Sequence, residues 1–227
     1  MEKRVIISLG GSIVIPKTGF DPAFLKQLRA MIENEVTQGR AFVLIVGGGT
    51  TARQYQDALR ATGKPSDTDL DWMGIAATKI NAEFVRLLFQ DIAYKEVISD
   101  PTKKIRTTKP VIIASGLRPG CSTDFRAVQY AKTYGAEDVM NLSNIEYVYD
   151  KDPAVYTDAK KITDISWTAF REIVGDTWSP GANAPFDPIA SKEAEKLGLR
   201  VSILKGTHLK EVKKAIAGKT FQGTVIY

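Results

Sequence analysis

Three glycine-bearing turns stand where the chain could hold phosphate groups. Each turn directly follows a short apolar run rich in β-branched residues, and the turns cover residues 8–12, 47–49 and 116–124. Glycine has no Cβ, so a ligand can approach its backbone closely. In an open α/β sheet, turns at the carboxyl ends of strands form the crevice in which ligands bind. Three such turns predict a phosphate-rich site that holds two nucleotides.

The turn of residues 47–49 carries the most specific signal of the three. It consists of three consecutive glycines, and Arg53 follows near the start of the expected helix. Free backbone N–H groups at a helix N-terminus attract anions, and a guanidinium can bind a phosphate through two parallel hydrogen bonds. A flexible connector with a surface arginine would show the same pattern, but the apolar strand before the glycines favours a phosphate site.

The turn of residues 116–124 ends in two hydroxyls and a carboxylate at the expected start of a helix. Ser122, Thr123 and Asp124 are residue types preferred as helix caps, and capping alone explains one of them. The hydroxyls could also contact a phosphate, and the carboxylate could orient catalytic groups or a hydrated Mg²⁺. The first turn lacks the spacing of a P-loop and Gly-x-Gly-x-x-Gly is absent, which argues against a Walker site and a dinucleotide site.

The apolar pattern predicts the elements that must position these turns. Amphipathic stretches predict helices, the longest over residues 70–90, and residues 187–188 form an Asp-Pro start signal. The predicted strands are residues 5–9, 42–46, 95–98, 111–114, 138–142, 201–204 and 223–226. Because strands and helices alternate, we expect an α/β fold, a three-layer αβα sandwich with a mostly parallel central sheet.

Three smaller interpretations concern positions near the turns. Thr50 or Thr51 is expected to cap the helix that follows the glycine triplet. The tryptophans are interpreted as core or interface residues rather than as base-stacking ones. Residues 179–185 form a stretch of small residues, which predicts a mobile loop.

The composition is that of an ordinary globular protein, with 44% hydrophobic and 25% charged residues among 227. The net charge of +5 is spread along the chain, whereas nucleic-acid-binding proteins usually concentrate basic residues on one face. A single cysteine excludes an intrachain disulfide, and a single histidine excludes a zinc site built from several histidines. No signal peptide or bilayer-spanning run is visible, so we expect a cytoplasmic protein that binds neither membranes nor nucleic acids.

Taken together, the motifs resemble the amino acid kinase family and, within it, the archaeal-type uridylate (UMP) kinases. The resemblance runs nearly end to end, and the combined set is specific although each segment alone is weak. The matching segments are residues 8–12, 47–49 with Arg53, 71–82, 119–124, 143–153, 187–190 and 223–224. The resemblance implies one amino acid kinase-type domain over residues 1–227. Its UMP-binding part would span roughly 1–135 and its ATP-binding part roughly 136–227.

The resemblance also implies an activity, the transfer of the γ-phosphoryl group of ATP to UMP, giving UDP. ATP and Mg²⁺ are the implied cofactors, and no metal-ligating side chain is assigned. In-line phosphoryl transfer depends on positioning and charge neutralisation. Catalytic roles would fall to Arg53, which would stabilise charge on the phosphates, and Asp124, which would organise the constellation.

Two subsites are implied by the same resemblance. The ATP-binding residues would be Ser8, Gly10, Gly11, Ser12, Gly49, Arg53, Ser143, Asn144, Tyr149 and Asp152. The UMP-binding residues would be Gly48, Asp71, Leu117, Arg118, Pro119, Gly120, Cys121, Ser122 and Thr123, with Asp71 on the ribose. The resemblance further implies a homo-oligomer, which in this branch is commonly a hexamer.

Two of the departures from the pattern of the family bear on the activity. Ser8 stands where many members carry a lysine, and Tyr147 stands where a glycine is usual. These departures leave open a nucleotide-binding or storage protein of the same fold with little catalysis. A sibling kinase for another small phosphate, such as isopentenyl phosphate, is a further alternative. That branch uses a histidine in its substrate pocket, whereas the only histidine here, His208, lies far down the chain.

Overall fold

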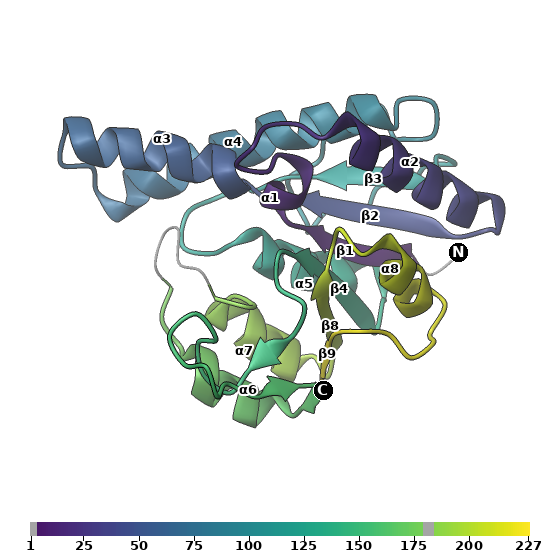
Figure 1. Ribbon diagram of the computed structural model, residues 1–227. Helices are drawn as coiled ribbons and strands as arrows, with labels where there is room; N and C mark the ends of the chain where they lie inside the picture. The colour runs from purple at the N-terminus through teal and green to yellow at the C-terminus, as the bar shows by residue number, and fades with distance from the viewer. Residues whose placement is uncertain (1–3, 179–183) are drawn as a thin grey trace.

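A mostly parallel sheet forms the centre of the molecule (Figure 1). The computed structural model describes residues 4–178 and 184–227, and within them the sheet has seven strands in the order β3-β2-β1-β4-β8-β9-β7. All neighbouring strands are parallel except β8 and β9. The strands are β1 (Arg4–Leu9), β2 (Ala41–Val46), β3 (Val111–Ala114), β4 (Asp138–Ser143), β7 (Asp164–Ile165), β8 (Arg200–Lys205) and β9 (Thr224–Ile226). Two short strands, β5 (Val148–Tyr149) and β6 (Lys161–Ile162), form a separate antiparallel pair.

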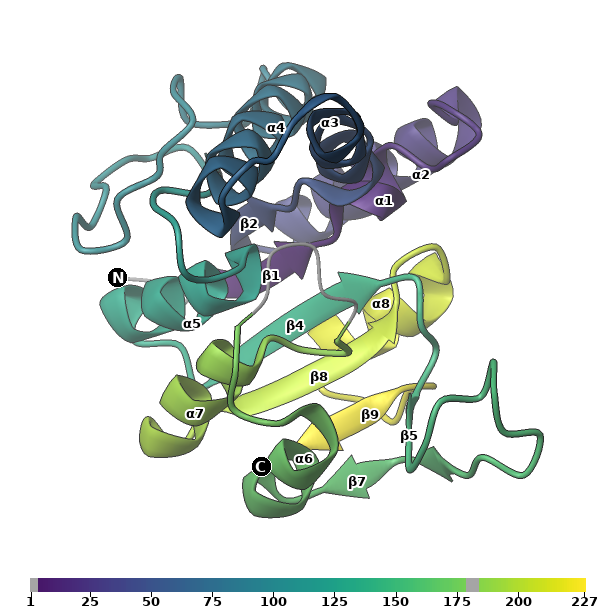
Figure 2. The same cartoon turned by 90° about the vertical axis from the view of Figure 1, so that its left-hand side faces the viewer.

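Helices cover both faces of this sheet, so the expected three-layer sandwich is confirmed. On one face, α5, α6 and α7 contribute Ala127, Phe170 and Ala190 to one buried cluster, whereas α2 and α4 contribute Leu28 and Val85 to the cluster on the other face. Figure 2 shows α5 and α7 in front of β4 and β8, with α8 behind them. The helices are α1 (Gly11–Val14), α2 (Pro22–Thr37), α3 (Gly49–Thr62), α4 (Asp67–Leu88), α5 (Thr123–Tyr134), α6 (Trp167–Val174), α7 (Pro188–Lys196) and α8 (Leu209–Ile216).

The side chains of each strand alternate between the two buried clusters, and the parallel pairing of the strands brings the turns to one edge of the sheet. Ile6 packs into one cluster and its neighbour Ile7 into the other, as the period of two along a strand requires. β1, β2 and β3 are parallel and paired in register, with Leu9 opposite Val46. Parallel strands end at the same edge of a sheet. The three glycine-bearing turns therefore lie together at the carboxyl edge, where the sequence predicted a ligand crevice.

Local structure differs from the sequence-based expectations at a few points. The short helix α1 begins within the first turn, at Gly11, and was not predicted. Residues 95–98 form no strand, and their one link to β3 is an isolated bridge between Ile98 and Ala114. Helix α3 begins at Gly49 with Gly48 as its N-cap, so neither Thr50 nor Thr51 caps it. Within the predicted small-residue loop, residues 179–183 lie outside the described residues.

Each helix within residues 4–178 and 184–227 is too short or too polar to cross a bilayer.

Candidate active site

The first two glycine turns interlock backbone against backbone. A Cβ on Gly11 would lie 2.3 Å from the carbonyl oxygen of Gly47, and a Cβ on Gly49 would lie 2.2 Å from the amide nitrogen of Ser12. Gly49 also has a φ of +54°, which favours glycine. Side chains at these positions would push the two turns apart. The glycines are therefore required by the packing of the turns themselves, quite apart from any ligand.

Asn81 of α4 holds the second turn through hydrogen bonds from the interior of the protein. Its amide Nδ2 donates to the carbonyl oxygens of Gly47 and Gly48, at 2.9 and 3.0 Å, and its side chain is buried. Helix α3 begins at this turn, and its N-cap, Gly48, has no side chain that could accept a hydrogen bond from the first amides of the helix. These amides are the donors that an anion at a helix N-terminus uses.

Arg53 lies against the first turn. Its Nη2 donates to Ser12 Oγ at 2.7 Å, and its side chain is only partly exposed. The side chain is therefore held against the first turn rather than extended into solvent. The guanidinium lies one helical turn beyond the glycines, a position from which an arginine can neutralise negative charge at the turn.

Asp124 ties the third turn to β1 and β4. Its Oδ1 accepts hydrogen bonds from Ser8 Oγ at 2.7 Å and from Asn141 Nδ2 at 3.3 Å. Its Oδ2 accepts from the amide of Asp187 at 3.4 Å. Burial raises the pKa of Asp124 to about 6, a shift that the Ser8 hydrogen bond opposes and the nearby Asp187 carboxylate reinforces. The residue that replaces the family's lysine, Ser8, therefore serves as a donor to the candidate catalytic carboxylate.

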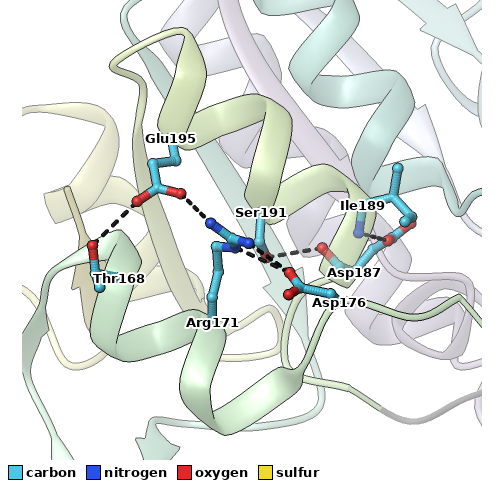
Figure 3. Close-up of polar contacts among 7 residues, drawn as sticks. All are labelled: Thr168, Arg171, Asp176, Asp187, Ile189, Ser191 and Glu195. Atoms are coloured by element: carbon cyan, nitrogen blue, oxygen red, sulfur yellow. Dashed lines mark hydrogen bonds and ion pairs between the residues drawn. The ribbon is translucent and has the colours of Figure 1, made fainter.

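Asp187 braces the same region from α7. Its Oδ1 caps the helix by accepting from the amide of Ile189 at 2.6 Å, and Ser191 Oγ donates to its carbonyl oxygen at 2.8 Å (Figure 3). Its Oδ2 accepts from the amide of Ser122, the N-cap of α5, at 2.8 Å. One carboxylate thus connects the starts of two helices and holds the third turn against α7.

Two cavities open at this edge of the sheet and share one wall. The larger has a volume of about 940 Å³ and the smaller about 240 Å³. The residues that line both are Gly48, Gly49, Arg53, Thr123, Asp124 and Ala184. The shared wall therefore contains both predicted catalytic residues. A phosphoryl group bound at this wall would be accessible from both sides.

All ten residues predicted for the ATP site line the larger cavity. They are Ser8, Gly10, Gly11, Ser12, Gly49, Arg53, Ser143, Asn144, Tyr149 and Asp152. Tyr147, the departure from the family's glycine, lines the same cavity, and the Lys161 ammonium lies 4.9 Å from the centre of its ring. The phenol therefore forms part of the wall of the larger cavity.

The residues predicted for the UMP site fall into two groups. Those that line the smaller cavity are Gly48, Asp71, Cys121, Ser122 and Thr123. Those that line neither cavity are Leu117, Arg118, Pro119 and Gly120. Their loop is nevertheless attached to the site, because the amide of Gly120 donates to Asp71 Oδ2 at 2.7 Å. Arg118 is exposed, and its carbonyl oxygen accepts from Arg126 Nη2 at 3.3 Å.

Several residues of the smaller cavity were not predicted as site residues. Gln56 of α3 lines it, with Nε2 bonded to the carbonyl oxygen of Leu70, and Thr78 Oγ1 accepts from the amide of Gly116 at 2.9 Å. Trp178 lines it as well and donates from Nε1 to Asp71 Oδ2 at 3.3 Å. The interpretation of Trp178 as a core or interface residue did not anticipate this position, because no local pattern links residues so far apart in the chain.

Comparison with known proteins places this geometry in a family. The family model described as the amino acid kinase family matches residues 3–205. The chain belongs to the amino acid kinase family. The family and fold expected from the glycine turns are therefore confirmed.

This chain is similar over nearly its whole length to relatives known by sequence and by structure. The uridylate kinases of Methanocaldococcus jannaschii and Hyperthermus butylicus are 31% and 30% identical to it, over 98% and 95% of this chain and 99% and 94% of theirs. The crystal structure of uridylate kinase from Archaeoglobus fulgidus superposes with a TM-score of 0.81 at 32% identity, covering 99% of this chain and 100% of that one. UMP kinase from Bacillus anthracis, at 18% identity, has a TM-score of 0.74 over 99% of this chain and 95% of its own, which reflects the fold alone.

Proposed function

We propose that this protein is a uridylate kinase that transfers the γ-phosphoryl group of ATP to UMP, giving UDP and ADP. One observation carries the proposal: two cavities meet at a wall formed by glycine-turn backbone, Arg53 and Asp124. In-line transfer requires the attacking and leaving oxygens on opposite sides of one phosphorus atom, which this arrangement allows. The uridylate kinases among its relatives support the same activity and substrates.

The two cavities divide the substrates by size. ATP is assigned to the larger cavity, which all ten implied ATP residues line, and UMP to the smaller one, which Asp71 lines. Residues 136–227 would supply much of the ATP site and residues 1–135 much of the UMP site. Both sets meet at the wall that contains Gly48 and Gly49.

Backbone amides and one guanidinium would stabilise the phosphates. The uncapped start of α3 at Gly49 offers N–H groups, and Arg53 adds a fixed positive charge beside them. Such preorganised donors lower the barrier because they need no rearrangement as charge shifts between the phosphates. Ser8 would keep the Asp124 carboxylate oriented toward the same wall.

The donor set fits a magnesium ion that is held largely by phosphate oxygens. Among the described residues no cluster of three or more acidic, histidine or cysteine side chains could enclose a metal ion. Mg²⁺ in kinases commonly binds through one or two carboxylates, substrate phosphates and water, and Asp124 provides a carboxylate at the shared wall. Bound there, Mg²⁺ would neutralise phosphate charge.

We further propose a homo-oligomer, a hexamer by analogy with this branch of the family, acting in the cytoplasm. Helix α4 exposes large apolar side chains that suit contact with a second copy: Ile80 is 65% exposed and Leu87 is 49% exposed. A reducing compartment suits a chain whose only cysteine, Cys121, has no partner for an intrachain disulfide.

An assay for UDP tests the proposed function. The protein is mixed with UMP, ATP and Mg²⁺, and UDP and ADP are quantified, with isopentenyl phosphate in place of UMP as a parallel reaction. We expect UDP and ADP in equal amounts, and little turnover of isopentenyl phosphate. Binding of UMP without UDP formation would instead identify a nucleotide-binding protein. Preferential turnover of isopentenyl phosphate would identify the sibling kinase.

A further inference from the structure

Asp71 is held by two donors that come from opposite parts of the chain. Its Oδ2 accepts from the amide of Gly120 at 2.7 Å and from the indole Nε1 of Trp178 at 3.3 Å. Among the described residues, no hydrogen bond reaches its other oxygen, Oδ1. A carboxylate has acceptor sites on both oxygens. The carboxylate is thus fixed on one side and has an acceptor left for a hydroxyl group of a ligand.

The chain reaches Asp71 through an anchored segment after α6. Gly175 turns the chain with a φ of 75°, and Arg171 of α6 binds Asp176 through Nη2 at 2.6 Å and Nε at 3.2 Å. The same guanidinium binds Glu195 of α7 through Nη1 at 2.7 Å (Figure 3). A guanidinium shared by two carboxylates ties this segment to both helices. Trp178 follows two residues later and is therefore attached to a braced part of the chain.

This segment also lines the smaller cavity. Val174, Thr177 and Trp178 line it together with Gly74 and Ile75 of α4. The indole is the largest of these side chains, and it combines an apolar surface with one N–H donor. The site assigned to UMP is therefore completed by residues from the part of the chain assigned to ATP.

We propose that Trp178 is a specificity-determining residue for the nucleoside part of the acceptor. Its N–H orients the Asp71 carboxylate for a ribose hydroxyl, and its ring provides an apolar wall for the pyrimidine. This inference rests on the proposed function, because it assumes that the smaller cavity holds the acceptor nucleotide. It assigns to Trp178 a role that neither the motifs nor the resemblance contains.

A Trp178 side chain that blocks Asp71 and one that orients it predict opposite effects on acceptor binding. If the indole merely occupied Asp71 until a ligand displaced it, removal of its N–H would strengthen acceptor binding. If Trp178 orients Asp71, removal of the N–H weakens acceptor binding and leaves the ATP cavity unchanged, since Trp178 does not line that cavity.

Steady-state kinetics of Trp178→Phe test the proposal, because phenylalanine keeps an aromatic ring and removes the donor. Loss of a hydrogen bond of ordinary strength predicts a rise in KM for UMP of about five- to tenfold. We expect kcat and KM for ATP to stay within about twofold of the wild type. Trp178→Ala, which also removes the wall, should raise KM for UMP further, and both variants should retain the wild-type unfolding temperature within a few degrees.

Trp72→Phe is the matched control. Trp72 lies next to Asp71 on α4, is 51% exposed and lines neither cavity. We expect this variant to keep the wild-type KM for UMP. A UMP titration should change the tryptophan fluorescence of the wild type and of Trp72→Phe, and leave that of Trp178→Phe nearly constant.

Three results would overturn the proposal. An unchanged or lower KM for UMP in Trp178→Phe contradicts the orienting role, and an equal rise in both KM values means that the substitution acts on the whole structure. A fluorescence response that persists in Trp178→Phe contradicts the placement of the acceptor beside the indole. Failure of the proposed function is a separate result, because the wild-type protein would then form no UDP in the same assay.

Discussion

At the scale of single residues, Asp124 combines a position on the shared wall of the cavities with several hydrogen bonds and a raised pKa. It lies on the wall between the cavities, accepts hydrogen bonds from Ser8 and Asn141, and faces Asp187 across the start of α7. A carboxyl group in these surroundings holds its proton to higher pH than usual, with a pKa of about 6. Its protonation state therefore changes close to neutral pH, where a bound cation would favour the ionised form.

The raised pKa predicts how Asp124→Asn changes stability with pH. The Asp124 carboxyl group has its ordinary pKa of 3.8 in the unfolded chain and a pKa of about 6 in the folded protein. The stability that protonated Asp124 contributes is therefore fully present below pH 3.8 and is lost as the pH rises through 6. Asparagine does not titrate. In urea unfolding, the stability of Asp124→Asn relative to wild type should rise by about 1 kcal/mol between pH 5 and pH 8.

Asp69→Asn is the control for this titration. The hydrogen bonds from Ser66 lower the pKa of Asp69 below its usual value, so this carboxylate is ionised throughout the same pH window. Its stability difference from wild type should stay constant between pH 5 and pH 8. If the stability difference between Asp124→Asn and the wild type also stayed constant between pH 5 and pH 8, the raised pKa of Asp124 would be contradicted.

At the scale of elements, the first two turns act as one unit. Each leaves its strand at the same edge of the sheet, and their backbones approach so closely that Gly11 and Gly49 cannot carry a Cβ. Asn81 of α4 bonds to the second turn from inside the protein. The turns therefore hold their shape through packing among protein groups, which keeps their amides in place before a ligand arrives.

This packing predicts unequal effects of two glycine substitutions. Gly39 and Gly49 both have a positive φ, but a Cβ on Gly39 would meet nothing within 4 Å, whereas one on Gly49 would lie 2.2 Å from the amide nitrogen of Ser12. Gly39→Ala should cost about 1 kcal/mol and leave UDP formation intact. Gly49→Ala should cost about 3 kcal/mol or more, measured by urea unfolding, and abolish UDP formation. Equal costs would contradict the interlocked turns.

At the scale of the whole molecule, the sheet brings distant parts of the chain together at one edge, where both cavities lie. The larger cavity is lined by residues from both ends of the chain, including Ser8 and Tyr149. The smaller cavity joins Asp71 of α4 to Trp178, which follows α6. A ligand in either cavity bridges elements that are distant in sequence, so binding should stabilise the fold as a unit.

Thermal unfolding with mononucleotides measures this coupling. A ligand present at about 100 times its Kd adds about 2.7 kcal/mol to the free energy of unfolding. For a chain of this length that amounts to a rise in unfolding temperature of about 5–10 °C. We expect UMP to give such a rise, and AMP and GMP at the same concentration to give clearly less. Equal shifts for all three would contradict a pyrimidine-selective acceptor cavity.

Much of the fold and of the larger cavity could be predicted because their signals are local. β-branched runs identify β1 to β4 and β8, and the Asp-Pro signal at residues 187–188 identifies the start of α7, which Asp187 caps. The glycine turns follow directly from strands whose ends must meet at one edge. All ten implied ATP residues accordingly line one cavity.

The smaller cavity was predicted less completely. Leu117, Arg118, Pro119 and Gly120 were predicted for the UMP site, yet they line neither cavity, although the amide of Gly120 donates to Asp71 Oδ2. Trp178 and Gln56 line the cavity without any motif that marks them. Their positions depend on how α3, α6 and α7 pack, and a linear pattern does not encode that packing.

The sequence by itself determined which residues form strands, which turns must be glycine and which family's chemistry the motifs match, because strand period, backbone freedom and capping are properties of neighbouring residues. Only the tertiary structure decided that Ser8 bonds to Asp124, that Asp187 joins α5 to α7 and that Trp178 reaches Asp71. These contacts join residues 116, 65 and 107 positions apart, and their distances are set by the packing of helices on a common sheet.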